Sequence, residues 1–480
     1  MEKEKLAEIS GRLVEILGGD SVESSGPRLV EYASDMTENP PHPPELVVFP
    51  GNTDQVSACL SIAQEYGVPV VPRVYNTNLG GLAIPQLGGI VIDLTKMNRI
   101  IEVNPDDLYM IIEPGVTQED VHNLLEKDFP ELRFGYSLAP PEVSVLANCI
   151  MDGLVNLSYR YGAMGQWVNG LEVVLPGGRV VRTGSSAVVE SWHGEPPLPH
   201  LSSLFFNAFG TTGVVTKAAI QLWPRPEFED RYFILCGDTT ATERLILRLS
   251  RSEIPDDIGI LSWPLGKLLF GNRKPLYRDP AEPLFIAYVS ISSNRKTMIN
   301  EKIACLRDLT GGLRDEGMKV EYPLNMDDLI RLEPSFAKFS RFPTRLDFLL
   351  DHEGEGLTWL GTYGPFSRWT EGAEFGMDLL LKNGMPPLVV SRPMWGGHFI
   401  VLRFIMMFDR SDGEELGKVR RLNRELFEKV IELGFIPYKT PPWAYRLLAE
   451  RMDPAFRNLM EGISHLVDPH KIMNPGKWPI

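Results

Sequence analysis

The residues best suited to hold a ligand form a glycine-rich segment, Pro72–Pro85, that follows a short apolar run. Asn76 and Thr77 supply neutral side-chain donors, and the pair Gly80-Gly81 lets the backbone approach a ligand closely. Consecutive N–H groups in such a loop can form a concave anion site. The segment indicates either a pyrophosphate-binding loop or a tight loop that binds nothing, because short glycine-rich matches do not separate the two.

Several common catalytic signatures are absent from the sequence. No GxGxxG follows a strand, and neither GxxxxGK(S/T) nor GxSxG occurs, which disfavours a Rossmann dinucleotide domain, a P-loop NTPase and an α/β-hydrolase. The four cysteines are far apart without CxxC, and the eight histidines form neither HxxxH nor HExxH. We therefore expect no metal site and no disulfide framework.

The composition indicates which kinds of binding partner are excluded. The chain has 480 residues, a formal net charge of −15 and 43% hydrophobic residues, as in a soluble globular protein with about three folding units. No Lys/Arg block occurs, so we expect no nucleic-acid partner and no electrostatic anchor to an acidic membrane. The N-terminus lacks the apolar part of a signal peptide and no window could span a bilayer, so we expect a cytoplasmic protein.

The first half of the chain is typical of alternating helices and strands. Residues 5–17 have helical spacing of apolar side chains. Thr53 is expected to cap a helix that Gly67 ends, and Thr117 with Asp120 predicts a capping box. The predicted strands are Leu46–Phe49, Val68–Val71, Gly89–Leu94, Leu108–Ile112 and Val214–Leu222, together with a hairpin of Leu171–Leu175 and Arg179–Arg182.

Residues 229–440 are predicted to form a second domain. Strand-like and helix-like runs alternate there, which favours an α+β sheet with helices on one face. The strand-like runs are Tyr232–Cys236, Leu284–Ile291 and His398–Phe408, and the helix-like runs are Glu243–Arg251, Arg295–Thr310 and Glu414–Leu433.

Six further motifs resemble one family in order and spacing. The family is the vanillyl-alcohol oxidase and p-cresol methylhydroxylase (4-cresol dehydrogenase) group of FAD flavoproteins. The resemblance covers most of residues 45–226, is thin in the middle of the chain, and returns from about 390 to the C-terminus. The motifs lie at Met97–Asn104, Glu113–Thr117, His122–Glu126, Tyr161–Gly178, Gly213–Lys217 and Asp468–Lys477.

The resemblance implies an α+β protein with the two-subdomain FAD-binding PCMH-type fold and an α+β cap that covers the flavin. It implies an N-terminal helical extension at 1–40, an FAD-binding domain at 41–228, a cap or substrate domain at 229–440 and a returning segment at 441–480. The pyrophosphate is expected on the Asn76–Gly81 loop. The implied cofactor-binding residues are Pro72, Arg73, Asn76, Thr77, Asn78, Leu79, Gly80, Gly81, Pro114, Gly115, Ser144, Asn148, Tyr161, Gly162, Gly213, Val214, Val215, His398 and Lys477.

His398 begins an apolar run in the implied cap. A histidine at about this point forms a covalent flavin bond in the resembling oxidases. The residue is therefore expected either to be such a tether or to be a hydrogen-bonded histidine beside the cavity.

Tyr438 and Lys439 stand where the family has a Tyr-Arg pair that holds a phenolate oxygen. Lysine still supplies positive charge, which lowers the pKa of a phenol from about 10, but it lacks the guanidinium fork. Neighbouring residues of a regular strand point to opposite faces, so both reach one ligand only if the backbone is irregular, as Pro437 and Pro441 suggest. The alternative is a surface lysine beside a packed tyrosine.

The sequence departs from the family at two positions where the family has residues that act on the substrate. The glycine pair is followed by Leu82 rather than by a tyrosine, and the position expected for the acidic base is Ala139. Glu142 lies three residues further on and is either a shifted base or a solvated carboxylate. Arg392 and Arg403 would be costly to bury without a partner, so one of them is expected to meet an anionic substrate or the flavin.

The sequence thus predicts an FAD-dependent oxidoreductase of the vanillyl-alcohol oxidase type, acting on a phenolic or other aromatic alcohol. The candidate catalytic residues are Tyr438, Lys439, Glu142 and Arg392. The alternatives are a 2-hydroxy-acid dehydrogenase, which usually has a histidine cluster in its cap, and a non-catalytic electron-transfer subunit. No CxxCH haem motif occurs, so any cytochrome acceptor is expected to be a separate chain, and we expect a homo-oligomer.

Overall fold

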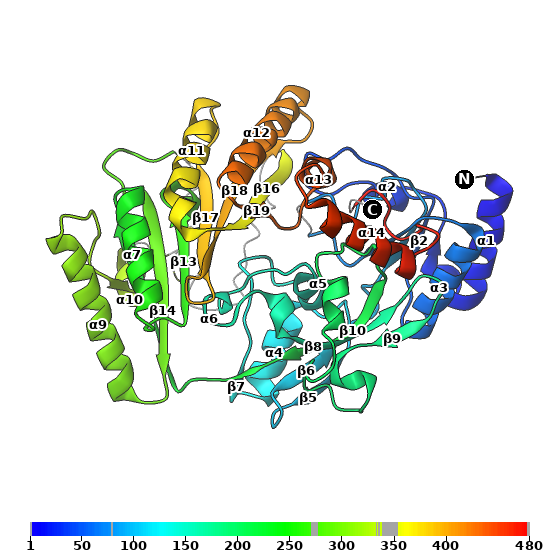
Figure 1. Ribbon diagram of the computed structural model, residues 1–480, viewed down its shortest axis with the longest axis horizontal. Helices are drawn as coiled ribbons and strands as arrows, with labels where there is room; N and C mark the ends of the chain where they lie inside the picture. Colours follow the sequence, from blue (N-terminus) through cyan, green and yellow to red (C-terminus); the bar gives the residue numbers. More distant parts are fainter. Residues whose placement is uncertain are drawn as a thin grey trace.

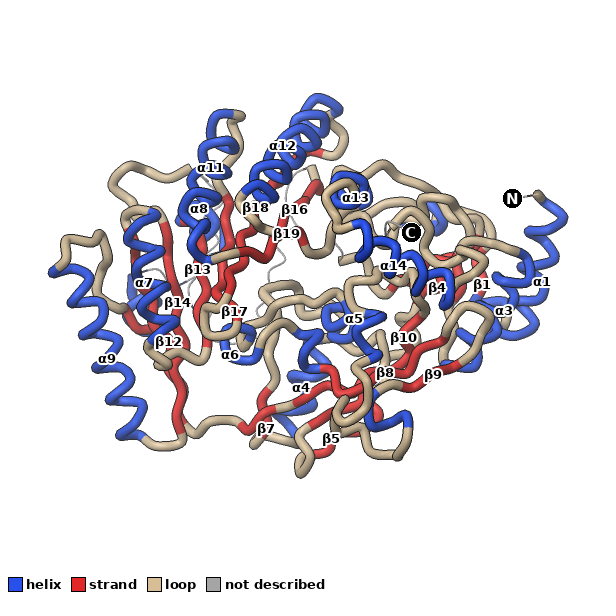
Figure 2. Tube along the Cα trace, in the orientation of Figure 1, coloured by secondary structure: helices blue, strands red, loops and turns tan. Residues whose placement is uncertain are grey.

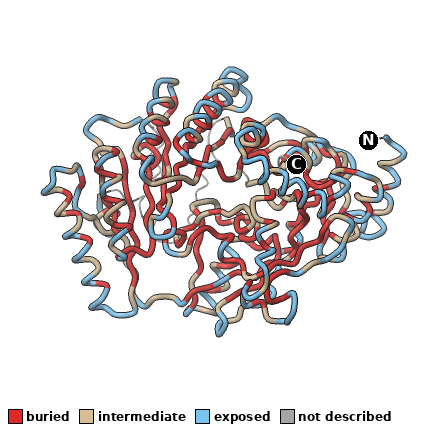
Figure 3. Tube along the Cα trace, in the orientation of Figure 1, coloured by how far each residue is buried: buried red, intermediate tan, exposed pale blue. Residues whose placement is uncertain are grey.

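The computed structural model describes residues 2–77, 80–269, 277–332, 334, 337 and 354–477. An eight-stranded sheet with its helices forms one end of the elongated molecule, and the smaller sheets form the rest (Figure 1). The helices expose one side and bury the other, whereas most strands are buried (Figure 3). In the described part of the chain, no helix is long and apolar enough to cross a membrane.

The first sheet has four strands in the order β1-β2-β4-β3. The last three pair in parallel, and β1 pairs antiparallel with β2. Apolar residues of α1 and α3 pack against this sheet. The elements are α1 (Lys3–Leu17), β1 (Val22–Glu23), α2 (Arg28–Glu31), β2 (Leu46–Val48), α3 (Thr53–Tyr66), β3 (Val70–Arg73) and β4 (Ile90–Asp93).

Capping residues mark both ends of α3, and one of the two predicted caps is wrong. Gly67 adopts a left-handed φ of 58° at the C-cap, as expected of a glycine that ends a helix. The predicted N-cap at Thr53 is wrong, because the side chain of Asn52 accepts the hydrogen bond from Gln55 N at 2.9 Å. Asn is at least as good a cap as Thr, and Asn52 directly precedes Thr53.

The second sheet is antiparallel, with five strands in the order β5-β6-β10-β8-β9. The predicted capping box of Thr117 and Asp120 is present at the start of α4, and the predicted hairpin is formed by β8 and β9. A two-stranded sheet of β7 and β11 adjoins it. The elements are β5 (Ile100–Asn104), β6 (Tyr109–Ile112), α4 (Gln118–Asp128), β7 (Leu132–Arg133), α5 (Val145–Ile150), α6 (Ser158–Tyr161), β8 (Val168–Val174), β9 (Val180–Arg182), β10 (Val214–Gln221) and β11 (Trp223–Pro224).

The third sheet is the large antiparallel sheet, in the order β15-β12-β14-β13-β17-β18-β16-β19. Figure 2 shows its strands beside long helices. The strands are β12 (Phe228–Cys236), β13 (Asp257–Ser262), β14 (Phe285–Ser293), β15 (Leu324–Asn325), β16 (Glu355–Gly364), β17 (Leu388–Met394), β18 (Phe399–Asp409) and β19 (Ile436–Pro437). The helices of this region are α7 (Thr239–Arg251), α8 (Trp263–Leu269), α9 (Lys296–Asp315), α10 (Met326–Leu332), α11 (Trp369–Lys382) and α12 (Gly413–Glu432).

The two faces of the large sheet have different roles. Helices α7, α9, α11 and α12 bury their apolar side chains on one face. The short helices α8 and α10 pack on the opposite face, so the expectation of helices on one face is only partly right. Because side chains alternate along a strand, Leu402 and Phe404 of β18 enter the helix-covered core, whereas Arg403 lines a cavity on the other face.

The end of the chain returns to the first sheet. Helices α13 (Pro442–Ala449) and α14 (Pro454–Val467) follow β19 and lie at the end of the molecule that holds the N-terminal elements (Figure 1). Val70 N donates to Ile472 O at 2.7 Å, and Asn474 N donates to Val70 O at 2.7 Å. The C-terminal segment thus pairs with β3, immediately before the glycine-rich loop.

Candidate cofactor and substrate site

Two adjoining cavities lie beside the glycine-rich loop. The sheet cavity, of about 130 Å³, is lined by the open face of the large sheet and by residues before and within α5. The β3 cavity, of about 110 Å³, is lined by residues after β3, by α5 and by the segment that leads into β10. Both are lined by Val74, Ala147 and Met151, so the two spaces meet at these side chains.

The β3 cavity collects six of the residues predicted to bind a cofactor. Its walls are mainly apolar, and the backbone forms part of them. At Gly213, a Cβ would lie 2.8 Å from Val174 O, so the absence of a side chain permits this close packing of the chain. The six residues are Pro72, Arg73, Pro114, Gly213, Val214 and Val215.

Arg73 is held at the edge of this cavity by an aromatic ring. Its guanidinium carbon lies 4.2 Å from the centre of the Tyr32 ring, and the Tyr32 hydroxyl donates to Asp93 at 2.5 Å. Burial lowers the pKa of Arg73. Arg73 is thus a buried cation beside an apolar cavity, where it can attract an anionic group of a ligand.

The glycine loop is held by protein groups from both ends of the chain. Gly81 N donates to Asp35 Oδ2 at 2.8 Å, and Lys477 Nζ donates to Gly81 O at 2.6 Å. The Gly81 N–H is therefore already used, which corrects the expectation that it binds pyrophosphate. Gly80, Gly81 and Lys477 are absent from the lining of both cavities, and Asn78 and Leu79 lie outside the described residues.

Asn76 keeps one acceptor for a ligand. Its Nδ2 donates to Ser34 O at 3.2 Å, while its buried Oδ1 has no partner among the described residues. A buried acceptor without a partner is costly. The predicted ligand loop therefore retains this one unsatisfied group, although Asn76 lines neither cavity.

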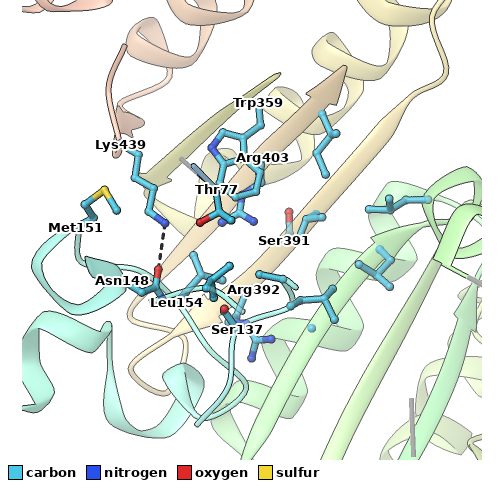
Figure 4. A pocket seen from close by; sticks show the side chains of 18 of the residues that line it. Thr77, Ser137, Asn148, Met151, Leu154, Trp359, Ser391, Arg392, Arg403 and Lys439 are labelled. Carbon is cyan, nitrogen blue, oxygen red and sulfur yellow. Dashed lines mark hydrogen bonds between the residues drawn. The ribbon is translucent and has the colours of Figure 1, made fainter. Parts of the chain in front are cut away.

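The sheet cavity contains three cationic side chains, all shown in Figure 4. Arg392 pairs with the buried carboxylate of Asp257 and donates to the Tyr288 hydroxyl. Burial raises the pKa of Asp257 to about 7, and the charge of Arg392 opposes that rise. In the described part of the chain, neither Arg403 nor Lys439 makes an ion pair with a carboxylate.

Arg403 and Lys439 lie around one tryptophan. The guanidinium carbon of Arg403 is 4.0 Å from the centre of a Trp359 ring, and Lys439 Nζ is 5.8 Å from it. Burial lowers the pKa of Arg403 to about 10. Burial and the charge of Arg403 together lower the pKa of Lys439 to about 7. Arg403 and the protonated form of Lys439 favour an anionic ligand between them.

The backbone directs Tyr438 and Lys439 differently. Lys439 has a left-handed φ of 51°, which is rare for lysine and interrupts the strand geometry after β19. Lys439 lines the sheet cavity and donates to Asn148 Oδ1 at 3.1 Å. Tyr438 is absent from the described lining, and its ring packs at a tilt against that of Tyr363, with ring centres 4.7 Å apart. Its buried hydroxyl has no partner among the described residues.

Other predicted residues are placed away from both cavities. Tyr161 stacks on Trp223 with ring centres 4.5 Å apart and belongs to the core below β8 and β10. Gly162, with φ +78°, leaves room for Gln166 and Trp395, whose side chains a Cβ would overlap. Gly115 accepts from the Tyr75 hydroxyl at 2.8 Å, and it lines neither cavity.

Two of the candidate catalytic or tethering residues, Glu142 and His398, line neither cavity. Glu142 is absent from the lining of both cavities, although Val143 and Ser144 line the sheet cavity. His398 is exposed on the turn between β17 and β18, and it too is absent from both linings. The turn is tied to α6, because Gly396 N donates to Tyr159 O at 2.8 Å. The structure therefore gives a covalent role of His398 no support.

Three predicted cofactor residues line the sheet cavity instead. These are Thr77, Ser144 and Asn148. Ala139, at the position expected for an acidic base, lines it as well. Asp35, Asp257 and Tyr288 were missed by sequence reasoning. No local motif marks them, and their partners Gly81 and Arg392 are far away in the chain.

Comparison with known proteins identifies the cofactor. Residues 44–184 match the model of the FAD binding domain family. The chain is 29% identical over 264 residues to a glycolate oxidase subunit of Bacillus subtilis, a match that covers 54% of each chain. It is 25% identical to the mitochondrial D-lactate dehydrogenase [cytochrome] of Arabidopsis thaliana, covering 90% of this chain and 73% of that one. It is also 25% identical to the 4-cresol dehydrogenase flavoprotein subunit of Pseudomonas putida, covering 96% and 93%.

Two solved structures have the same fold over nearly the whole chain. One is p-cresol methylhydroxylase with substrate bound, with a TM-score of 0.86, 20% identity, and coverage of 99% of this chain and 97% of that one. The other is 4-ethylphenol oxidase from Gulosibacter chungangensis, with a TM-score of 0.87, 21% identity, and coverage of 100% and 98%.

The chain is therefore an FAD-binding flavoprotein. Residues 44–184 match the FAD binding domain family, and the chain as a whole has the fold of PCMH-type flavoproteins. The described residues fit this cofactor, because the mainly apolar β3 cavity suits a ring system. Arg73, and the Asn76 Oδ1 that has no partner among the described residues, offer polar contacts beside it. When bound, FAD supplies the hydride acceptor.

Among the described residues, no group of three His, Cys, Asp or Glu side chains is arranged to hold a metal ion.

Proposed function

We propose that the sheet cavity binds a phenol or another aromatic alcohol, from which a hydride leaves for FAD. The observation that carries the proposal is the placement of Arg403 and Lys439 around Trp359, with no carboxylate ion-paired to either in the described part of the chain. Relatives named as a cresol dehydrogenase subunit and an ethylphenol oxidase support this substrate class.

The chemistry of the cavity supports an aromatic substrate with an ionisable hydroxyl. Positive charge near a phenol favours its phenolate, and an electron-rich phenolate loses hydride from the attached carbon more readily. Trp359 offers a face for stacking. The remaining described walls are mainly aliphatic, including Leu138, Leu154, Leu261, Leu265 and Ile405.

We propose the following roles for the parts of the chain. Residues 41–228, with the returning segment 441–480, hold FAD through the β3 cavity, while 229–440 supply the sheet that covers the reacting side. Residues 1–40 form the N-terminal extension. The pairing of Val70 with residues 472 and 474 supports the return of the last segment.

A 2-hydroxy acid is the second candidate substrate. The same two cations suit a carboxylate, and relatives named as a glycolate oxidase subunit and a D-lactate dehydrogenase support it. Arg392 is less suited to this role, because its guanidinium already contacts Asp257 and Tyr288.

We also propose that a separate acceptor takes the electrons from FAD. One relative is named as a flavoprotein subunit and another as a cytochrome-linked dehydrogenase, which supports a partner of this kind.

Anaerobic reduction of the flavin tests the substrate. The purified FAD-loaded protein is mixed with para-alkylphenols and benzylic alcohols, and separately with glycolate and both lactates, while flavin bleaching is followed. Bleaching by the phenols alone supports the first candidate, and bleaching by hydroxy acids alone overturns it in favour of the second. Failure of every donor leaves only the electron-transfer alternative.

A charge variant assigns the effect to the cavity. Arg403→Gln is expected to slow reduction by phenols about a hundredfold, the usual cost of removing one charge-stabilising donor. Arg403→Lys keeps the positive charge, so its rate of flavin reduction by phenols should fall less than that of Arg403→Gln. The matched control is Arg421→Gln, because Arg421 is exposed on α12 and has only a 4.0 Å pairing with Glu425.

A further inference from the structure

The sheet cavity lacks an ordinary general base in its described lining. No Asp, Glu or His is among these residues, and Ala139 stands at the position where an acidic base was expected. Oxidation of an alcohol or phenol nevertheless releases the proton of its hydroxyl group as well as a hydride. Some group in the cavity must take that proton or pass it to water.

Three of the four titratable groups in the described lining are unsuited to this task. Tyr288 has its pKa raised to about 12 by burial, and it accepts a hydrogen bond from Arg392. Arg392 is committed to Asp257. Arg403 keeps its charge near neutral pH even though burial lowers its pKa to about 10.

The remaining group is Lys439, and its contacts leave it able to accept a proton. Its Nζ donates to Asn148 Oδ1 at 3.1 Å. Asn148 is oriented for this contact because its Nδ2 donates to Met164 Sδ at 2.9 Å. A neutral amine can donate one hydrogen to Asn148 and still present its lone pair to the cavity.

The charges around Lys439 favour the neutral amine. Arg403 of β18 repels a second positive charge, whereas the half-buried Asp152, after α5, attracts one without an ion-pair contact. The rings of Trp359, Tyr363 and Tyr438 surround the same region without adding a negative charge. Burial and Arg403 outweigh Asp152, so the pKa of Lys439 falls to about 7.

We propose that Lys439 is the general base that takes the proton from the hydroxyl group of the substrate in the sheet cavity. The inference rests on the proposed function. The substrate O–H bond breaks and an N–H bond forms on Nζ, which gives the ammonium ion. The electron pair of a C–H bond leaves as hydride for FAD, which is the oxidant. This C–H bond is on the carbinol carbon of an alcohol or on the side-chain carbon attached to the ring of an alkylphenol, so the substrate loses two electrons and two hydrogens. The ammonium and Arg403 then face the anionic oxygen.

The count of protons released on binding distinguishes this role from that of a fixed positive charge. The probe is unsubstituted phenol, which has no side-chain carbon to oxidise. It is added to the FAD-loaded protein at pH 8 in weak buffer with an indicator dye, and its ultraviolet difference spectrum reports phenolate. If Lys439 is the base, bound phenolate forms with about 0.1 proton released, because a group with pKa 7 is about one-tenth charged at pH 8.

Two variants at Lys439 supply the reference values for proton release and for the phenolate spectrum. Lys439→Arg keeps a permanent charge and cannot take the proton, so phenolate binding should release about one proton per ligand. Lys439→Met should bind phenol without the phenolate spectrum. The wild-type count decides the question even if a variant does not fold.

The possible failures are distinguishable. A wild-type release of about one proton with a phenolate spectrum shows that Lys439 is already charged, which overturns the base while the proposed function stands. Absence of any phenol binding, together with no bleaching by alkylphenols, overturns the proposed function and this inference with it.

Discussion

Lys477 Nζ donates to Gly81 O at 2.6 Å, so a buried lysine, the last residue that the structure describes, holds the glycine loop that follows β3. Asp35 holds the N–H of the same glycine. The loop is therefore fixed on one peptide by an acceptor from the N-terminal region and a donor from the C-terminal region.

Removal of this donor should weaken cofactor binding. Lys477→Met leaves the Gly81 carbonyl without its buried partner, which costs about 1–3 kcal/mol. We expect the affinity of the apoprotein for FAD to fall about tenfold, measured by quenching of FAD fluorescence. Lys471→Met, an exposed change on the same segment, is the control. Equal affinities of the two variants would contradict the prediction.

The two buried lysines should make stability depend on pH. The pKa values of Lys439 and Lys477 are lowered to about 7 from an ordinary 10.5. Between these values the unfolded chain binds more protons than the folded one, so the free energy of unfolding rises with pH and the cost of burial is greatest below pH 7. Each lysine contributes at most about 1.4 kcal/mol per pH unit in this window.

Urea unfolding of the apoprotein at pH 7.5 and pH 9 measures this effect. The stability of the wild type relative to Lys477→Met should increase with pH. Parallel behaviour of the two proteins would show that Lys477 keeps its ordinary pKa in the folded state.

Gly162 should tolerate no side chain. With φ +78°, and with Gln166 and Trp395 in the space of a Cβ, Gly162→Ala is expected to cost about 2 kcal/mol through backbone strain and the lost Trp395–Gln166 hydrogen bond. Gly462→Ala in α14 has open space and should instead gain about 0.5–1 kcal/mol. Thermal unfolding of both variants tests the contrast, and similar midpoints would refute it.

His398→Ala should leave flavin retention unchanged, because His398 is exposed and lines neither cavity. The measurement is acid precipitation followed by spectra of pellet and supernatant. A wild-type pellet that stays yellow, and turns pale only in the variant, would restore the covalent role.

The Asp257–Arg392 pair should be far more important for stability than a surface pair. Asp257→Asn leaves the buried Arg392 without its counter-charge and is expected to cost about 3–5 kcal/mol. Glu316→Gln breaks the exposed pair with Arg248 and should cost less than about 1 kcal/mol. Denaturant unfolding of the two variants gives the comparison, and a small loss for Asp257→Asn would mean that the pair adds little.

The sequence predicted elements where the signal is local. The capping box at Thr117 and the end of α3 at Gly67 depend on a few adjacent residues. Strand β16 was missed because glycines weaken a strand pattern. In the structure these glycines make room for rings: a Cβ on Gly361 would lie 2.7 Å from Cε1 of Tyr438.

The site was predicted in outline but not in its pairings. Family-like motifs located Pro72, Gly213 and Lys439 at the two cavities. Charge partners could not be predicted, because Asp257 and Arg392 are 135 residues apart and meet only through neighbouring strands. The reach of Lys439 depends on its left-handed φ, which no residue preference of lysine indicates.

The return of the chain to β3 also has a consequence for biosynthesis. Residues 472–477 complete the first sheet and hold Gly81, so the cofactor loop has no final geometry while these residues are still inside the ribosome. We therefore expect stable FAD loading to follow the synthesis and docking of residues 472–477. A truncated chain that ends before residue 472 would leave its cofactor domain open.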